Sequence, residues 1–434
     1  MKRITTIAAA VGLVLLAGTF GPAQAQEGVI VLRGGVVHTL ADGDQPIENG
    51  VVVIRDGRIA AVGGMDTDVP AGAEIIDVSG QHVYPGFFDS VTRIGLTEIG
   101  AVAVTSDLGE NSDNNPHLEA ASAVHPASEI IPVTRANGVT HAVAAPQGSG
   151  IAGQGSLIHL DGWTVEEMFV ENVYMVAAWP TLQTRGFNRA TFTAFNRSFA
   201  EATEEYEAAI AKLEALLDDA RRYAASNAND DPTQRNFKSE ALGPVLRGEQ
   251  PMLITVNSER GIRDAIAFAD RNKVKIVIAG GREAWRIADE VAASGVPVIL
   301  GATQALPSRE DDPYDAPYAA PGKLHAAGVK FAISTFNASA ARTLPYEAST
   351  AVPYGLPYDE ALKSVTRYPA EIMGVGDSLG TLEAGKIANL FVSDRDPLDI
   401  ATQVTHVFIQ GRLIDPYDNK HDNSYQKYRA RPRR

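Results

Sequence analysis

The sequence predicts an α/β protein, a (β/α)8 TIM-like barrel joined to a small β-sandwich domain that is built from both chain ends. Three observations support this prediction. Short alternating strands dominate residues 29–83, apolar strands alternate with amphipathic helices through residues 85–384, and strands of the first kind return at 387–414. With 434 residues, of which 45% are hydrophobic, the chain can bury a sizeable core.

The first 25 residues follow the pattern of a signal peptide. Lys2 and Arg3 precede an apolar run over residues 4–20, and Ala23-Gln24-Ala25 has the small residues of a cleavage site. We therefore expect an exported protein, periplasmic or extracellular. A membrane anchor is the alternative, but the run is short for a spanning helix, and no later segment approaches that length. We expect no stable membrane insertion after cleavage.

The charge balance argues against nucleic-acid partners. The formal net charge is -15, and without residues 1–25 the 36 basic side chains face 53 acidic ones, which gives -17. Such a surface repels nucleic acid and anionic lipid. The basic end of the chain, within the polar tail predicted at 417–434, is interpreted as a solvated terminus. Cysteine is absent, which excludes disulfides, thiolate ligands and a cysteine nucleophile.

The predicted sandwich domain combines residues 26–84 with residues 385–416. Its N-terminal part contains two strands on either side of Asp56-Gly57, a tight hairpin signal between alternating apolar residues. These strands are too few to close a core alone. Segments of the same character occur at 387–394 and 404–414, so the two chain ends are predicted to pair.

The barrel domain is predicted at residues 85–384. Helices are expected near 128–136 and 165–175, and the fourth barrel strand is placed at "MVAAWP", residues 175–180. The other predicted strands are "FFDS", "GVTHAVAAP", "GSLIHL", "MLITV", "VKIVIAG", "VPVILG" and "VKFAIST", which alternate with predicted helices to give a parallel barrel.

Two segments carry a family resemblance. "VYPGFFD" (83–89) follows an N-terminal β segment, and residues 355–398 give a helix, the 380–386 turn and a returning strand in matching order and spacing. Together they resemble the amidohydrolase superfamily, specifically its secreted imidazolonepropionase-like members. The resemblance covers almost all of the chain after Gln26.

The resemblance implies a metal-dependent hydrolase of carbon–nitrogen bonds other than peptide bonds, such as those of cyclic amides. One or two divalent metal ions, zinc or another, would be held at the C-terminal mouth of the barrel. The implied ligands are His-x-His after strand one, a lysine or glutamate after strand four, single histidines after strands five and six, and an aspartate after strand eight. The metal activates a water molecule and the aspartate accepts its proton.

This sequence departs from that pattern at every position that can be matched. The His-x-His pair falls on Val91 and Arg93, neither of which can bind a cation. The strand-five ligand falls on Thr255, the strand-six ligand near Gly280, and the strand-eight aspartate on Phe336. The sequence therefore predicts a metal-free barrel with no cofactor.

The bridging lysine is excluded by position, because no lysine occurs between Lys2 and Lys212 and strand four precedes the latter. Glu166, Glu167 and Glu171 remain as carboxylates that could bridge metal ions. The acidic loop at 107–117 could supply oxygen ligands to calcium or a replacement metal, although it lacks EF-hand spacing.

Four residues near the expected barrel mouth are candidate ligand-binding groups. Arg93 and Glu98 follow strand one and are expected to form a charged pair if both face the mouth; Asn257 and Arg282 follow strands five and six. A small molecule is their expected partner.

Three functions stay open at this point. The first is a catalytically degenerate or ligand-binding amidohydrolase-like protein, in effect a pseudoenzyme. The second is an active hydrolase of carbon–nitrogen bonds with an unconventional site. The third is a scaffold, or a partner subunit of an intact paralogue, in a homo- or hetero-oligomer.

Overall fold

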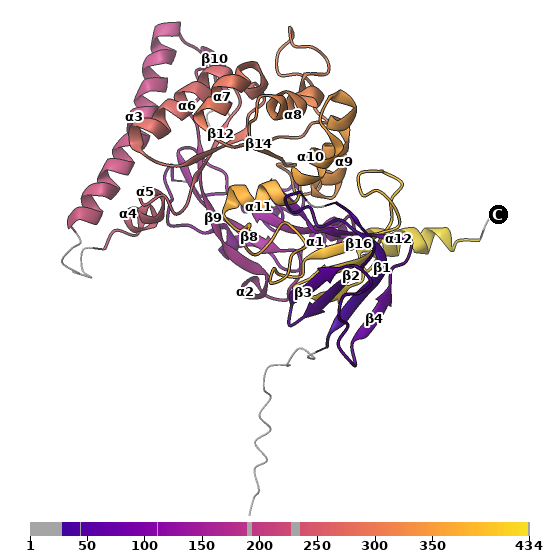
Figure 1. Cartoon of the computed structure of the whole chain (residues 1–434). Coiled ribbons are helices and arrows are strands. Elements are labelled where there is room, and N and C mark those ends of the chain that lie inside the picture. Colours follow the sequence, from indigo (N-terminus) through magenta and orange to yellow (C-terminus); the bar gives the residue numbers. More distant parts are fainter. Residues whose placement is uncertain (1–27, 44, 111, 189–192, 227–234, 433–434) are drawn as a thin grey trace, which may run out of the picture.

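The computed structural model describes residues 28–43, 45–110, 112–188, 193–226 and 235–432, and the predicted signal peptide lies outside them. Two eight-stranded sheets organise these residues, one formed by terminal strands and one that curls into a barrel (Figure 1). No helix within these ranges is both long and apolar enough to cross a membrane.

The terminal sheet unites the two chain ends, as predicted. Strand β5 (His82–Pro85) pairs with β1 (Ile30–Val37) on one side and with β16 (Leu390–Ser393) on the other. Hydrogen bonds link all its strands into one continuous sheet. The remaining strands are β2 (Ile47–Arg55), β3 (Arg58–Gly63), β4 (Glu74–Asp77), β17 (Val404–Ile409) and β18 (Arg412–Ile414).

Asp56 and Gly57 form the hairpin that the sequence indicates. They are the only residues between β2 and β3, and their φ angles are 50° and 75°. Two successive positive φ values define the turn whose twist matches that of the flanking strands. The hairpin aligns Ile54 with Ile59, both buried in the core of this domain.

The barrel sheet runs in the order β15-β14-β13-β12-β9-β8-β7-β6. Strand β9 includes Met175 to Ala178, so the predicted position of strand four is confirmed, although the strand begins earlier. The strands are β6 (Phe87–Thr92), β7 (Val139–Ala144), β8 (Ile151–His159), β9 (Phe169–Ala178), β12 (Met252–Val256), β13 (Ile276–Gly280), β14 (Val298–Leu300) and β15 (Phe331–Ile333).

The prediction of an all-parallel barrel is wrong at β8, which runs antiparallel to both β7 and β9. Only residues 145–150 connect β7 to β8. A parallel connection needs a crossover of a dozen or more residues, so this short link forces a hairpin. All other neighbouring strands of the barrel pair in parallel.

The helix predicted at 165–175 is also mostly wrong. It is a single turn, α2 (Val165–Met168), capped by Thr164, whose hydroxyl oxygen accepts from the amide of Glu167 at 3.3 Å. From Phe169 onward the chain is strand β9. Valine and tyrosine favour strands, and the antiparallel neighbour β8 supplies the pairing partner.

Helices cover the outside of the barrel, and one of them lies at the N-terminal ends of the strands. Helix α11 (Arg367–Met373) places Ala370, Ile372 and Met373 in the apolar cluster that fills the barrel interior. The 28-residue α3 (Phe199–Ser226) lies along the outer edge (Figure 1). The others are α1 (Ile130–Arg135), α4 (Phe237–Ala241), α5 (Gly243–Leu246), α6 (Glu259–Asn272), α7 (Ala288–Ser294), α8 (Ala316–Ala326), α9 (Leu344–Ala351) and α10 (Tyr358–Lys363).

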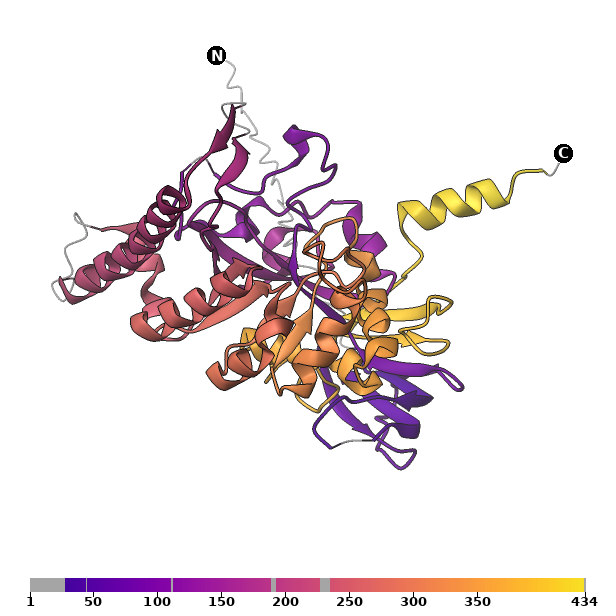
Figure 2. The same cartoon turned by 90° about the horizontal axis from the view of Figure 1, so that it is seen from above.

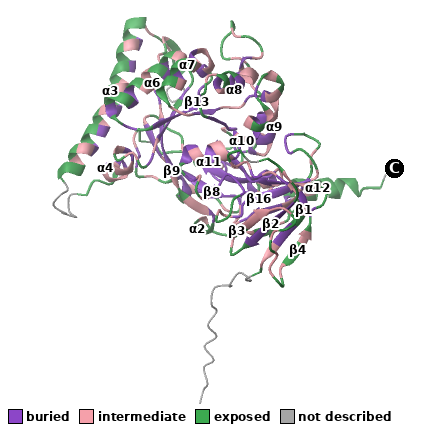
Figure 3. Cartoon of the chain, viewed as in Figure 1, coloured by how far each residue is buried: buried purple, intermediate pink, exposed green. Residues whose placement is uncertain are grey.

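The predicted polar tail contains a helix that projects from the body. Helix α12 (Lys420–Arg429) extends away from both sheets in the view from above (Figure 2) and has no buried residue. Figure 3 shows the contrast with the barrel strands, which are mostly buried. The barrel mouth, where β6, β12 and β13 end, is the expected position of a functional site.

Candidate functional site

A cavity of about 210 Å3 lies at the C-terminal ends of the barrel strands. Four of the five positions matched to family ligands line it: Val91, Arg93, Thr255 and Phe336. The cavity is therefore at the position that the family resemblance indicates. Its other lining residues are Thr92, Ala145, Pro146, Gln147, Gly148, Ala152, Val176, Ala177, Ala178 and Leu253.

Asp89 lies below this cavity and joins the first barrel strand to the last. Its carboxylate accepts hydrogen bonds from the hydroxyls of Ser334 and Thr335 and, at 3.0 Å, from the backbone amide of Thr335. The hydroxyl of Ser334 also accepts from the amide of Val91 at 2.9 Å. Asp89 is fully buried, and burial raises its pKa to about 7. These contacts give Asp89 a structural role in barrel closure.

Arg93 directly follows β6 and faces the side chain of Gln147. In the amide orientation that satisfies both groups, the Gln147 side-chain oxygen accepts from Arg93 Nε at 3.1 Å and Nη2 at 2.9 Å. Gln147 lies in the short link between β7 and β8, the same link that makes β8 antiparallel. Among the described residues, no carboxylate forms an ion pair with Arg93.

Phe336 and Val91 form the wall beside Arg93. Phe336 has a φ of 54°, which is rare for a bulky residue, and its amide donates to the carbonyl of Val91 at 3.0 Å. The ring packs against the barrel-interior cluster, to which Val91 belongs. An aromatic ring thus occupies the place where the resemblance implies a proton-accepting carboxylate.

Gly280, matched to the strand-six ligand, lies just outside the cavity lining. Its φ is 90°, and a Cβ at this position would approach Asn257 Oδ1 to 2.5 Å. A histidine here would require both an unfavourable backbone conformation and a displaced asparagine. The position matched to the strand-six ligand therefore has no room for a histidine side chain without these two changes.

The candidate ligand-binding residues separate in space. Arg93 lines the mouth cavity, whereas Asn257 lies against Gly280, and the exposed Arg282 lines a separate cavity of about 30 Å3 beside β13 and β14. Glu98 forms no ion pair with Arg93, and its Oε1 is buried without a hydrogen-bond partner among the described residues. Arg93 is the one of these four that the structure brings into the mouth cavity.

The structure adds two positions that the sequence left unassigned. Strand β9 ends at Ala178, so the strand-four ligand position falls on small apolar residues of the cavity lining. Gln147 is the other, and its only signal in the sequence is its place in a glycine-rich turn. Glu166 and Glu167 lie in or near α2, before β9 begins, and Glu171 pairs with Leu157 across the sheet, so these three glutamates are distant in sequence from the end of the strand.

The acidic loop is tied to the start of β8. Ser149 donates to Asp113 Oδ1 at 2.6 Å, and the Ile151 amide donates to Asn114 Oδ1 at 3.0 Å. Both oxygens thus support local structure. Within the described ranges, no group of three or more histidines, aspartates or glutamates is arranged to hold a metal ion.

The mouth does not fit the metal that the resemblance implies. The side chains that replace the ligands are two hydrocarbon groups, a hydroxyl and a permanent cation, on Val91, Phe336, Thr255 and Arg93. A divalent ion needs imidazole or carboxylate donors, and a guanidinium beside it would repel it. We therefore derive no catalytic step through a metal.

A buried polar cluster joins the start of β7 and the end of β8 to the terminal sheet. Asn389 Nδ2 donates to His141 Nε2 and, at 2.9 Å, to His159 Nδ1. Burial lowers the pKa of His159 to about 4 and holds that of His141 well below its ordinary value. Neutral imidazoles fit this arrangement, because each must accept from the amide.

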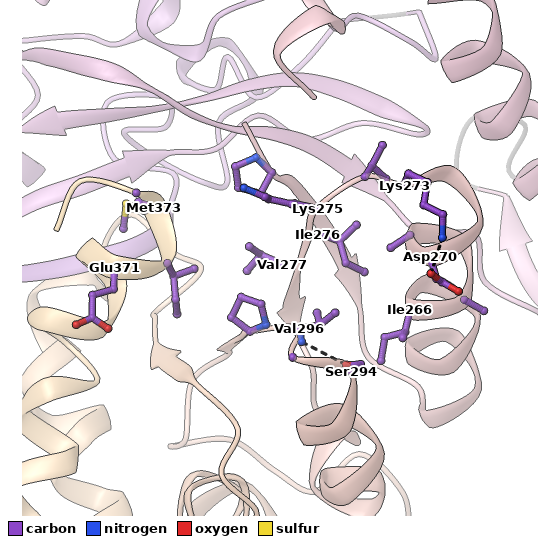
Figure 4. A pocket seen from close by; sticks show the side chains of 18 of the residues that line it. Ile266, Asp270, Lys273, Lys275, Ile276, Val277, Ser294, Val296, Glu371 and Met373 are labelled. Carbon is purple, nitrogen blue, oxygen red and sulfur yellow. Dashed lines mark hydrogen bonds and ion pairs between the residues drawn. The ribbon is translucent and has the colours of Figure 1, made fainter. Parts of the chain in front are cut away.

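A larger cavity, of about 1050 Å3, lies at the N-terminal ends of the barrel strands, where Pro251, Lys275 and Pro297 line it. Figure 4 shows its lining side chains. It is bounded by α6, α7 and α11, with Ile276 and Val277 at the start of β13 in its floor. Its charged groups are largely paired, for example Lys273 with Asp270 at 3.0 Å. Active sites of such barrels lie at the C-terminal ends of the strands, so the smaller cavity is the candidate site.

Comparisons with known proteins agree with this fold. Residues 315–414 match the model of the amidohydrolase family. The crystal structure of an amidohydrolase from Thermotoga maritima MSB8 superposes with a TM-score of 0.76 and 26% identity, covering 89% of this chain and 99% of that one. The chain has the amidohydrolase-superfamily fold, an α/β barrel with an additional sheet of terminal strands.

Two curated relatives are similar over parts of their length. The amidohydrolase tasK of Hapsidospora irregularis is 26% identical over 378 residues, which is 80% of this chain but 37% of that protein. The N-substituted formamide deformylase of Arthrobacter pascens is 45% identical over 75 residues, 16% of this chain and 12% of that protein. This chain therefore spans only about a third of the length of the amidohydrolase tasK.

Proposed function

We propose that the chain is an exported, catalytically degenerate amidohydrolase-like protein that binds a small molecule at the barrel mouth without a metal ion. The observation that carries this proposal is that Val91 and Arg93, the residues at the positions matched to the His-x-His pair, both line the mouth cavity. The cavity lies where the resemblance places the active site, but the side chains of Val91 and Arg93 cannot bind a divalent cation. The proposed export rests on the signal-peptide pattern of residues 1–25.

The resemblance to secreted imidazolonepropionase-like members supports a small organic ligand rather than a macromolecule. The cavity is a recess between the ends of several barrel strands, and its volume of about 210 Å3 suits a small molecule. The strongly acidic composition supports the exclusion of nucleic acid. Oligomers with itself or with an intact paralogue are compatible with this function.

Metal analysis tests the proposal directly. Protein purified without chelator should contain far less than one zinc, manganese or iron ion per chain, and added metal should leave its melting temperature unchanged, because a ligand stabilises only if it binds the native state. Near-stoichiometric metal would contradict the proposal.

An activity screen tests the alternative of a working hydrolase. The names of the relatives indicate amides and N-substituted formamides as substrates for the panel. We expect no hydrolysis above that of a protein-free control. Hydrolysis that a chelator abolishes and zinc restores would establish the alternative.

A further inference from the structure

Arg93 is a partly buried cation without an acidic partner among the described residues. Many other arginines of this acidic chain pair with a carboxylate, as Arg309 does with Glu283 at 2.7 Å. Withdrawing a guanidinium from water without a counter-charge is costly, so such a group points to an anionic ligand.

The geometry around Arg93 leaves specific donors open. Gln147 accepts from Nε and from one N–H of Nη2, at 3.1 and 2.9 Å. A guanidinium has five N–H donors, so the two on Nη1 and one on Nη2 remain. These form the outer edge of the fork, which matches the two oxygens of a carboxylate. Gln147 also fixes the plane of the fork, since it holds the opposite edge.

The walls of the cavity define the rest of the ligand. Val91, Val176, Leu253 and Phe336 present hydrocarbon, and Thr255 adds a single hydroxyl. The volume of about 210 Å3 suits a small organic molecule. One cation and one apolar chamber suit a singly charged planar group with a short hydrocarbon body better than a phosphate, which usually binds several cations or a nest of backbone amides.

We propose that the barrel mouth binds a small monocarboxylate, with its two oxygens on the Nη1 and Nη2 edge of Arg93 and its hydrocarbon body against Val91 and Phe336. This inference rests on the proposed function, since it identifies the ligand class of the same cavity. The inference adds that the ligand must carry a negative charge, which the proposed function alone does not require.

The first experiment compares carboxylates with neutral molecules of the same shape. Hexanoate and phenylacetate are the probes, and hexanamide and phenylacetamide are their matched controls, in thermal-shift and calorimetric titrations of the full mature chain. We expect the acids to raise the melting temperature and bind at least about tenfold more tightly than the amides, which corresponds to about 1.4 kcal/mol.

Two variants assign the effect to Arg93. Arg93→Met should weaken acid binding about 10- to 100-fold, as expected for a lost charge-assisted pair, and leave amide binding unchanged. Gln147→Glu should place a carboxylate beside Arg93 within the chain, so acid binding falls while the melting temperature of the free protein stays equal or rises. Arg222→Ala, which removes an exposed arginine paired with Asp219 on α3, is the matched control for net charge.

The outcomes separate this inference from the proposed function. Equal binding of acids and amides, insensitive to Arg93→Met, would overturn the carboxylate inference and leave a metal-free binding site intact. Absence of any response to either acid would also overturn it. Stoichiometric metal in the purified protein would overturn the proposed function itself.

Discussion

The side-chain carboxyl group of Asp89 accepts a hydrogen bond from the backbone amide of Thr335 at 3.0 Å, and this contact joins the first strand of the barrel to the residues that follow the last. Burial is the main cause of the raised pKa of the Asp89 carboxyl group, which is about 7. Asp89 therefore closes the barrel beneath the candidate site and titrates near neutrality.

This pKa predicts a specific dependence of stability on pH. Because the folded state keeps a proton on Asp89 up to about pH 7 and the unfolded chain releases it near pH 3.8, the contribution of Asp89 is complete below pH 3.8 and is lost as the pH rises through about 7. In urea unfolding across this pH range, the free energy of unfolding of the natural chain should fall by on the order of a few kcal/mol more than that of Asp89→Asn, whose amide does not titrate. Parallel curves for the two proteins would contradict the assignment.

The two histidines at the start of β7 and the end of β8 predict the opposite dependence, a stability that rises with pH. His141 and His159 are neutral in the fold, and the pKa of His159 is lowered to about 4. Their contribution is therefore present above about pH 6.5 and is lost as the pH falls through about 4. His159→Gln should flatten this acid limb in urea unfolding, whereas His421→Ala, at an exposed position on α12, should not.

Asn389 holds these two imidazoles against the terminal sheet, and its loss should be costly at neutral pH. Asn389→Ala leaves buried ring nitrogens without their donor, which is expected to lower the free energy of unfolding by about 1 to 3 kcal/mol. The measurement is urea unfolding near neutral pH, with Asn423→Ala on the exposed helix α12 as the control. A loss no larger than that of the control would show that the cluster is not holding the domains together.

The hairpin and the order of the strands followed from local patterns in the sequence, and the error in strand direction arose because an apolar pattern carries no direction. Asp56-Gly57 fixes its hairpin through two positive φ angles, a property of those residues alone. The direction of β8 depends on the length of the link before it, and its apolar run has the same appearance in either direction.

The candidate site divides in the same way. Val91, Arg93, Thr255 and Phe336 could be placed at the mouth because each follows or ends a strand whose apolar run is evident. The contact between Arg93 and Gln147 could not, since 54 positions separate them and nothing in either segment marks the other. The expectation of a partner for Arg93 fell on Glu98, which is near in sequence but forms no ion pair with it.

Gly280 predicts a cost for any side chain at the strand-six position. Gly280→Ala would adopt a φ of 90° and bring its Cβ to 2.5 Å from Asn257 Oδ1, so we expect a loss of roughly 1 to 3 kcal/mol. In an Asn257→Ala background the clash disappears and only the backbone term remains, so the same substitution should cost less. Urea unfolding of the four proteins gives the coupling energy. Equal costs in both backgrounds would show that Asn257 is not the obstacle.

Introducing histidines at the matched positions that line the mouth cavity should create a metal site. Val91, Arg93 and Thr255 line one cavity, so the triple variant Val91→His, Arg93→His, Thr255→His brings three imidazoles to the mouth and removes the repelling guanidinium. Zinc at 100 times its dissociation constant would stabilise such a variant by about 2.7 kcal/mol, visible as a rise of several degrees in the melting temperature. The natural chain and the single variant Val91→His should not respond, because a lone imidazole does not form a site. If the folded triple variant binds no zinc, the three positions do not converge on a common point, and the shape of the barrel mouth as well as its side chains would then prevent metal binding.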